Sequence, residues 1–125
     1  PIETFSIPDI KGNKANYIYS KTYTGNGKLY GYFNVPGYVS NPPDYVNDKS
    51  MQTFEIDVYN KTVKKMNFDG TTGWSCSQCK AGDYMVFGMA STQGTGYYLY
   101  NYKEDKYEPL KIKTEGNPFK IQYLK

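Results

Sequence analysis

The sequence predicts an all-β protein built from antiparallel four-stranded meanders that repeat along the chain. Three observations favour this fold class. Fifteen of the 125 residues are Tyr and six are Phe, and aromatic side chains suit the half-buried surface of a strand. No window of about eleven residues carries the i, i+3, i+4 apolar stripe of an amphipathic helix. The third observation is an internal repeat, whose period indicates one sheet per copy.

The repeat is clearest in two hairpins that align at an offset of 44 residues, which places Asp57 on Asn101. The strands ahead of these hairpins align at an offset of 55, which places Gly27 on Gly82. The first copy therefore holds an insertion of about eleven residues, and we assign it to the Pro-rich segment 35–50, an exposed loop.

Alternating side chains and turn residues place the strands. Asn26-Gly27 supplies the positive φ of a tight turn at low cost. The first copy, about 15–70, is expected to hold strands at 15–23, 28–34, 51–59 and 62–67. The second copy, about 73–113, is expected to hold strands at 74–80, 83–90, 97–102 and 106–112, followed by a trailing strand at 119–124.

Four strands in about 45 to 55 residues is the size of one β-propeller blade. We therefore expect residues 1–125 to form a single all-β unit of two blades with partial flanking strands. Two blades do not close a propeller, and the chain begins at Pro1 without an initiator Met, so we expect a fragment of a larger propeller. The alternative is a compact β-sandwich or barrel.

Composition disfavours several function classes. The net charge of +3 comes from dispersed lysines rather than a basic face, so no nucleic-acid partner is expected. No apolar run is long enough to span a bilayer, and none of the printed residues is expected to form a signal peptide. With no His, the chain cannot form a Ser-His or Cys-His pair, so we expect a binding protein without a cofactor rather than an enzyme.

The two cysteines, Cys76 and Cys79, form a Cys-Ser-Gln-Cys segment. Zinc takes about four ligands, and this chain has no further Cys and no His for the usual set, so no metal site is expected. Two states remain open: a local disulfide outside the cytosol, or two free thiols packed in a strand.

A family resemblance rests on Gly-Lys-Leu-Tyr at Gly27, on Phe-Glu-Ile-Asp-Val at Phe54, and on Thr-Val-Lys-Lys at Thr62. Together they resemble blades of the β-propeller lipoproteins on the surface of Bacteroidetes, and the segment 98–112 resembles the C-terminal blade of that group. The resemblance implies an extracellular or cell-surface location, with the periplasm as the alternative.

Some members of that group capture siderophores beside TonB-dependent transporters. The resemblance therefore implies a small-molecule ligand such as a siderophore or similar iron carrier. It also implies two partners, the remainder of the parent chain and an outer-membrane transporter. The alternative functions are glycan binding and a protein-interaction scaffold that binds no small ligand.

The candidate ligand-binding residues lie on the loop 35–50, where Tyr38, Asp44 and Tyr45 are offered to solvent. Aromatic faces stack on sugars and on planar catecholate or haem-like rings, and nearby polar groups fix the orientation of the ligand. Trp74 and Tyr32 are second candidates. The alternative for each aromatic residue is packing between sheets with its polar atom in water.

Overall fold

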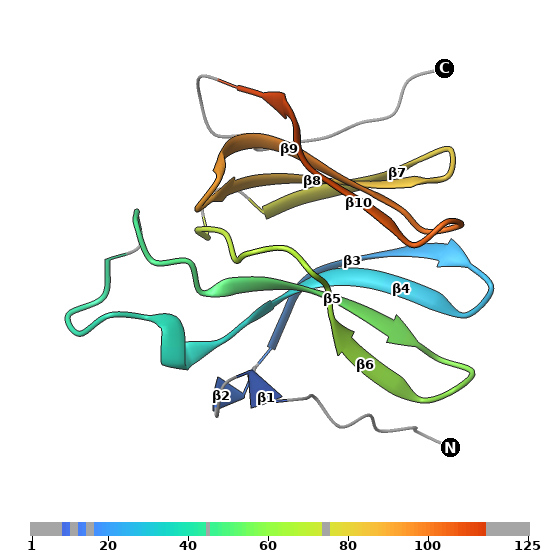
Figure 1. The fold of residues 1–125 in the computed structure, drawn as a ribbon. Helices are drawn as coiled ribbons and strands as arrows, with labels where there is room; N and C mark the ends of the chain where they lie inside the picture. The colour runs from blue at the N-terminus through green and yellow to red at the C-terminus, as the bar shows by residue number, and fades with distance from the viewer. Residues whose placement is uncertain (1–8, 11–12, 15–16, 45, 74–75, 115–125) are drawn as a thin grey trace.

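The fold is all-β, as the sequence predicts, and it is built of two antiparallel four-stranded sheets, each a simple meander (Figure 1). The computed structural model describes residues 9–10, 13–14, 17–44, 46–73 and 76–114. The first sheet contains β3 (Tyr17–Gly25), β4 (Lys28–Asn34), β5 (Met51–Asp57) and β6 (Thr62–Lys65). The second sheet contains β7 (Cys76–Ala81), β8 (Tyr84–Ser91), β9 (Gly94–Asn101) and β10 (Lys106–Lys113).

Three short elements complete the described fold. A small antiparallel ladder joins β1 (Asp9–Ile10) to β2 (Asn13–Lys14), and a single 3-10 turn, η1 (Pro36–Tyr38), follows β4. Figure 1 shows this ladder on the side of the first sheet that faces away from the second. No helix among the described residues has the length and apolar character needed to cross a membrane. The predicted strand 119–124 lies outside the described residues.

The predicted tight turn between the first two strands is confirmed. Asn26 and Gly27 both have positive φ, 54° and 72°, and Gly25 pairs with Lys28 across the turn. Positive φ at both central residues is the type I′ geometry, whose twist matches that of the flanking strands. The turn therefore fixes the β3–β4 register.

The repeat holds in three dimensions, but its alignment ahead of the loop differs by one residue from the sequence alignment. Lys28 and Tyr84 are equivalent, because Lys28 pairs with Asp57 as Tyr84 pairs with Asn101. The sequence alignment matched Gly27 to Gly82, whereas Gly82 occupies the place of Asn26. Both residues have positive φ, 54° for Asn26 and 61° for Gly82, and either residue type tolerates that conformation.

A one-residue change of register exchanges the two faces of a strand, so the correction decides which faces of the sheets are equivalent. In the second sheet, the face toward the first carries the cross-strand pairs Met85–Tyr100 and Phe87–Tyr98. The equivalent pairs of the first sheet, Leu29–Ile56 and Gly31–Phe54, lie on its far face. The two sheets therefore meet head to tail, through faces that are not equivalent.

The first sheet is consequently buried on both faces. Its far face carries one apolar core of four buried side chains: Phe33, Val35, Phe54 and Ile56. The face toward the second sheet contributes to a larger core with these buried members: Tyr30, Tyr32, Met51, Met66, Phe68, Cys76, Met85, Phe87, Met89, Tyr98 and Tyr100. A two-layer sandwich has its core between the sheets and leaves its outer faces polar, and this chain departs from that pattern. Within the described residues the two sheets also remain separate, with no closed barrel.

Aromatic rings and a few polar contacts join the two sheets. Phe68, in the segment between them, makes edge-on contacts with Phe87, Tyr98 and Tyr107, with ring centroids 5.0 to 5.9 Å apart. When the Gln78 amide is oriented so that its oxygen faces the donors, this oxygen accepts from the backbone N–H of Lys21 at 2.9 Å, and a side chain of β7 then covers part of the free edge of β3.

Candidate functional site

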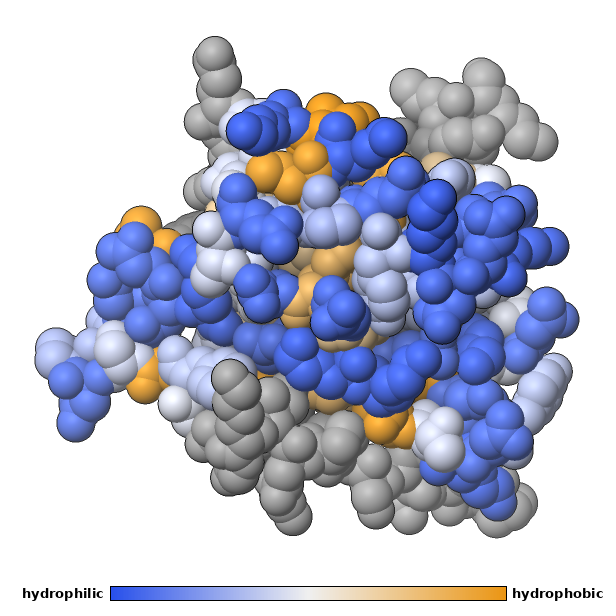
Figure 2. Space-filling model, viewed as in Figure 1, coloured by the Kyte–Doolittle hydropathy of each residue, from blue (hydrophilic) through white to orange (hydrophobic). Residues whose placement is uncertain are grey.

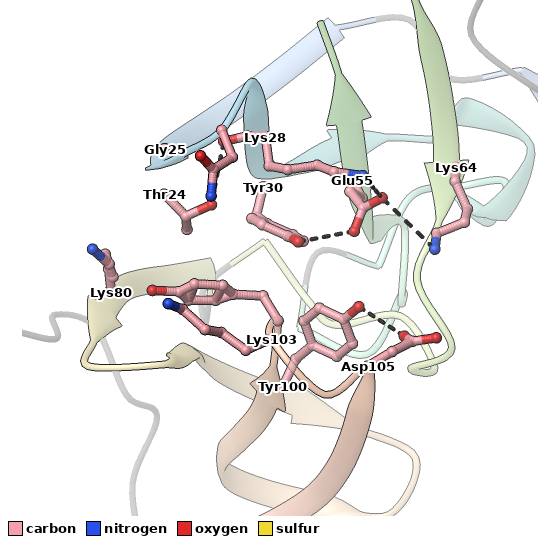
Figure 3. A pocket seen from close by; sticks show the side chains of 12 residues that line it. Thr24, Gly25, Lys28, Tyr30, Glu55, Lys64, Lys80, Tyr100, Lys103 and Asp105 are labelled. Carbon is pink, nitrogen blue, oxygen red and sulfur yellow. Dashed lines mark hydrogen bonds and ion pairs between the residues drawn. The ribbon is translucent and has the colours of Figure 1, made fainter. Parts of the chain in front are cut away.

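The candidate site is a cleft between the two sheets at the end where the hairpin turns gather, with a volume of about 540 Å³ (Figure 3). That volume lies in the usual range for small-ligand pockets. We call it the inter-sheet cleft, and define it by these lining residues: Thr24, Gly25, Asn26, Lys28, Tyr30, Glu55, Lys64, Lys80, Tyr100, Tyr102, Lys103 and Asp105. Figure 2 shows mostly hydrophilic side chains on the face seen in Figure 1, with hydrophobic atoms visible between them near the middle.

Three tyrosines form the aromatic wall of the inter-sheet cleft. Tyr30 comes from β4, Tyr100 from β9 and Tyr102 from the turn that follows β9. The ring of Tyr30 lies 5.8 Å from that of Tyr100 and 6.4 Å from that of Tyr102, centroid to centroid. Tyr30 and Tyr100 belong to the core between the sheets, with exposed fractions of 1% and 3%, and they support the half-buried ring of Tyr102, which presents surface to the cleft.

Two tyrosine hydroxyls donate to carboxylates at the edge of this wall. Tyr30 donates to Glu55 Oε2 at 2.8 Å, and Tyr100 donates to Asp105 Oδ1 at 2.7 Å. Burial raises the pKa of both tyrosines far above the ordinary value, and the hydrogen bond to a carboxylate raises it further. Both hydroxyls therefore stay protonated and give their single hydrogen to a carboxylate of the chain, so neither tyrosine acts as a phenolate ligand.

The lysines contributed by the first sheet are already paired with carboxylates. Lys28 Nζ lies 3.2 Å from Glu55 Oε1 and 3.0 Å from Asp57 Oδ2, and Lys64 Nζ lies 3.7 Å from Glu55 Oε1. The hydrogen bond to Asp57 is the largest influence that raises the pKa of Lys28. Both ammonium groups are therefore already engaged by carboxylates of the first sheet.

The lysines contributed by the second sheet have no such partner. Lys80 of β7 and Lys103 of the β9–β10 turn are exposed, and no ion pair or side-chain hydrogen bond engages their ammonium groups within the described part of the chain. Figure 3 shows both on the same side of the cleft, opposite Glu55 and Lys64. The cleft lining holds four lysines and two carboxylates, so an anion is the kind of charge that it would attract.

Tyr38, the first sequence candidate, lies at a different place. It is half-buried against the far-face core of the first sheet and borders a second hollow of about 570 Å³ with Lys49, Gln52 and Lys65. Two polar groups there are occupied, since Lys65 Nζ donates to the carbonyls of Met66 and Phe68, and Gln52 Nε2 donates to that of Lys49. This hollow therefore offers a ligand fewer free polar groups than the inter-sheet cleft.

Asp44 organises the backbone of its own loop. Its Oδ1 accepts from the N–H groups of Val46 and Asn47, and its Oδ2 accepts from the Asn47 side chain at 2.9 Å. The Asn47 bonds lower the pKa of Asp44, which keeps it ionised. Asp48 likewise accepts from Ser40. These are the turn-stabilising roles that Asp commonly takes.

The structure corrects the assignment of Tyr32 as a ligand-binding residue. Its exposed fraction is 0%, its ring packs edge-on against Phe87, and its hydroxyl lies 2.9 Å from the carbonyl oxygen of Ser77. A side chain enclosed between two sheets has no surface left for a ligand. Tyr45 and Trp74, the other predicted aromatic residues, lie outside the described residues.

Cys76 and Cys79 both lie in β7 and form no disulfide with each other. Cys76 pairs with Met89 and is buried in the core between the sheets, whereas Cys79 pairs with Val86 on the opposite face. Positions three apart in a strand point to opposite faces, so a disulfide between them would require the strand to be rebuilt. The arrangement is therefore two thiols packed in a strand, not a local disulfide.

Sequence reasoning missed the inter-sheet cleft, although it placed the strands that form it. Lys80 and Lys103 belong to different hairpins of the second sheet. They line the same cleft as Tyr30 only because the sheets stack head to tail. The signal that could have found them is the repeat itself, read in the corrected register.

Among the described residues there is no group of three or more His, Cys, Asp or Glu that could hold a metal ion. The chain matches no family model, no curated protein and no solved structure.

Proposed function

We propose that this chain is a small-ligand-binding module and that its ligand is a compact anion with a planar or sugar ring, held in the inter-sheet cleft. The proposal rests on two lysines beside the tyrosine wall, Lys80 and Lys103, whose ammonium groups have no ion-pair partner among the described residues. The half-buried ring of Tyr102 offers stacking surface, and the ammonium groups offer charge-assisted hydrogen bonds. Ferric catecholate siderophores and acidic glycans both combine these two features.

The resemblance to surface β-propeller lipoproteins gives this proposal a setting. There the module would be one segment of an extracellular ligand-binding propeller that presents an iron carrier to an outer-membrane transporter. Head-to-tail sheets support the propeller part of the proposal, because that contact can repeat from sheet to sheet. The cleft supports the ligand part.

A titration with defined probes tests the proposal. Ferric tris-catecholate, a uronic-acid oligosaccharide and a neutral oligosaccharide of equal length would each be titrated by calorimetry at two salt concentrations. We expect at least one of the two anionic probes, ferric tris-catecholate or the uronic-acid oligosaccharide, to bind with an affinity that falls as the salt concentration rises. The neutral oligosaccharide should bind far more weakly. Equal binding of the neutral and acidic sugars, without salt dependence and with no binding of the ferric probe, would contradict the charge assignment.

The double variant Lys80→Gln/Lys103→Gln locates the site. Loss of two charge-assisted contacts should weaken binding about 10-fold, or about 1.4 kcal/mol. The matched control is Lys106→Gln/Lys113→Gln, which removes two exposed lysines of β10 that do not line the cleft. A Tyr38→Ala variant tests the second hollow, which Tyr38 borders. If Tyr38→Ala weakens binding and the double variant of the cleft does not, the ligand binds in the second hollow and not in the inter-sheet cleft.

A further inference from the structure

The second sheet carries a counterpart of the face that the first sheet buries, and in the described part of the chain this counterpart is only half-buried. Tyr30, Thr53 and Glu55 line the first sheet's face toward the second sheet, and their exposed fractions are 1%, 1% and 8%. The strand pairings make Val86, Tyr97 and Leu99 their equivalents, in that order. All three lie on the second sheet's outer face, and all three are only half-buried.

The outer face is largely apolar along its two middle strands, where Asn101 lies opposite Tyr84, and the edge strand β10 adds Glu108 opposite Leu99. Along β8 and β9 it presents Tyr84, Val86, Tyr97 and Leu99, and the inner face of the same strands presents methionines and aromatic rings. A strand that faces water on one side normally alternates apolar with polar residues, whereas a strand covered on both sides is apolar throughout. On this criterion β8 and β9 have the composition of strands that are covered on both faces.

The contact between the two sheets indicates what covers this face. That contact joins non-equivalent faces, so it is heterologous and can be made again by the outer face of the second sheet, whereas the far face of the first sheet is already buried. The surface that fits the first sheet's contacting face is the inner face of the second sheet, with Met85, Phe87 and Tyr98. A surface of the same design would fit the outer face of the second sheet.

We infer that the outer face, defined by Tyr84, Val86, Tyr97 and Leu99, docks a third four-stranded antiparallel sheet that is contributed by another repeat of the same polypeptide. That sheet presents methionine and aromatic side chains from its two middle strands. The inference deepens the propeller part of the proposed function, because both rest on the contact between the sheets, and it is independent of the ligand proposed above.

A second copy of this chain is a poorer occupant. The surface that it would have to present is the far face of its first sheet, because that face is the equivalent of the second sheet's inner face. Phe33, Phe54 and Ile56 on that far face are already buried, with exposed fractions of 1%, 0% and 8%. A second copy would therefore have to uncover an existing core before it could dock.

Thiol labelling in the protein expressed from its complete reading frame tests the inference. A Leu99→Cys substitution in a Cys79→Ser background places a reporter on the outer face, and buried Cys76 remains as an unreactive internal reference. The matched control is Lys113→Cys in the same background, because Lys113 is exposed at the end of β10. Maleimide labelling rates and the intact mass are measured together, and Val86→Cys replaces Leu99→Cys if that variant does not fold.

We expect an intact mass well above the 14.3 kDa of these 125 residues, and labelling of the Leu99→Cys variant roughly 100-fold slower than that of the control, as for a site reached only by local opening. Labelling at the control rate would overturn the docking face. A mass of 14.3 kDa would overturn the same-polypeptide source. Protection that disappears on dilution would do the same, because it would identify a second copy as the occupant.

Discussion

At the scale of the residue, tyrosine has two roles in this molecule, and they overlap. Tyr30 and Tyr100 line the inter-sheet cleft and are also buried in the core between the sheets, whereas Tyr32 and Tyr98 belong to that core without lining the cleft. Buried tyrosines keep a partner for the hydroxyl, as Tyr32 does with the backbone carbonyls of the second sheet. Sequence alone could not separate the two roles, since both kinds of tyrosine sit in strands with the same alternation.

Removing the Tyr32 hydroxyl should weaken the contact between the sheets. A Tyr32→Phe variant keeps the ring against Phe87 but leaves the carbonyl of Ser77 without this donor, so we expect a loss of about 1 kcal/mol in the free energy of unfolding. Urea denaturation measures the change, with Tyr59→Phe on an exposed turn as the control that should change little. An equal effect of the two substitutions would contradict the structural role of the Tyr32 hydroxyl.

Asp57 makes the free energy of unfolding fall as the pH is lowered. The backbone N–H and side chain of Asn60, together with Lys28, hold the pKa of Asp57 below its ordinary value. Its contribution is therefore complete above the pKa of the unfolded carboxyl, about 4, and is lost as the pH falls below that value. An Asp57→Asn variant should be less stable than the native chain at pH 7, and the difference should shrink at pH 3. A difference that is the same at both pH values would show that Asp57 acts through packing rather than charge.

At the scale of the element, the strands and turns follow from local sequence because each depends on neighbouring residues. Asn26-Gly27 predicts its turn by its conformational preference, and the alternation of Met51 to Asp57 predicts β5. The equivalence of the faces was not predictable in the same way. Glycine stands at the second position of the β3–β4 turn and at the first position of the β7–β8 turn, so aligning Gly27 with Gly82 shifts the register by one residue.

Gly27 is the position where the first turn depends most on glycine. Its φ is +72°, and a Cβ there would lie 2.8 to 2.9 Å from ring atoms of Tyr59. A Gly27→Ala variant should lose about 1 to 2 kcal/mol in the free energy of unfolding, because a side chain is strained in this conformation. Gly73→Ala is the control, since nothing lies within 4 Å of its Cβ position and its φ is not in the left-handed region. Thermal denaturation of the pair measures the effect, and equal midpoints would contradict the account of the turn.

At the scale of the whole molecule, the inter-sheet cleft and the outer docking face are both consequences of how the two sheets meet. The all-β class and the repeat of four-stranded meanders were predictable from composition and from the recurring hairpins. The cleft was not, because its residues are spread from Thr24 to Asp105 and converge only after the sheets stack. Aligning Gly27 with Gly82 leaves the placement of the strands unchanged. This shift of one residue nevertheless exchanges the two faces of a strand, so the faces that touch could not be identified from the alignment.

The head-to-tail contact is the central claim, and one NMR measurement tests it most directly. Nuclear Overhauser effects between side chains report which faces lie together. The structure predicts cross-peaks between the rings of Tyr30 and Tyr100, whose centroids are 5.8 Å apart, and between Tyr32 and Phe87, 5.7 Å apart. Cross-peaks of Leu29 and Phe33 with Met85 and Met89, in place of these, would show that equivalent faces meet and would contradict the account.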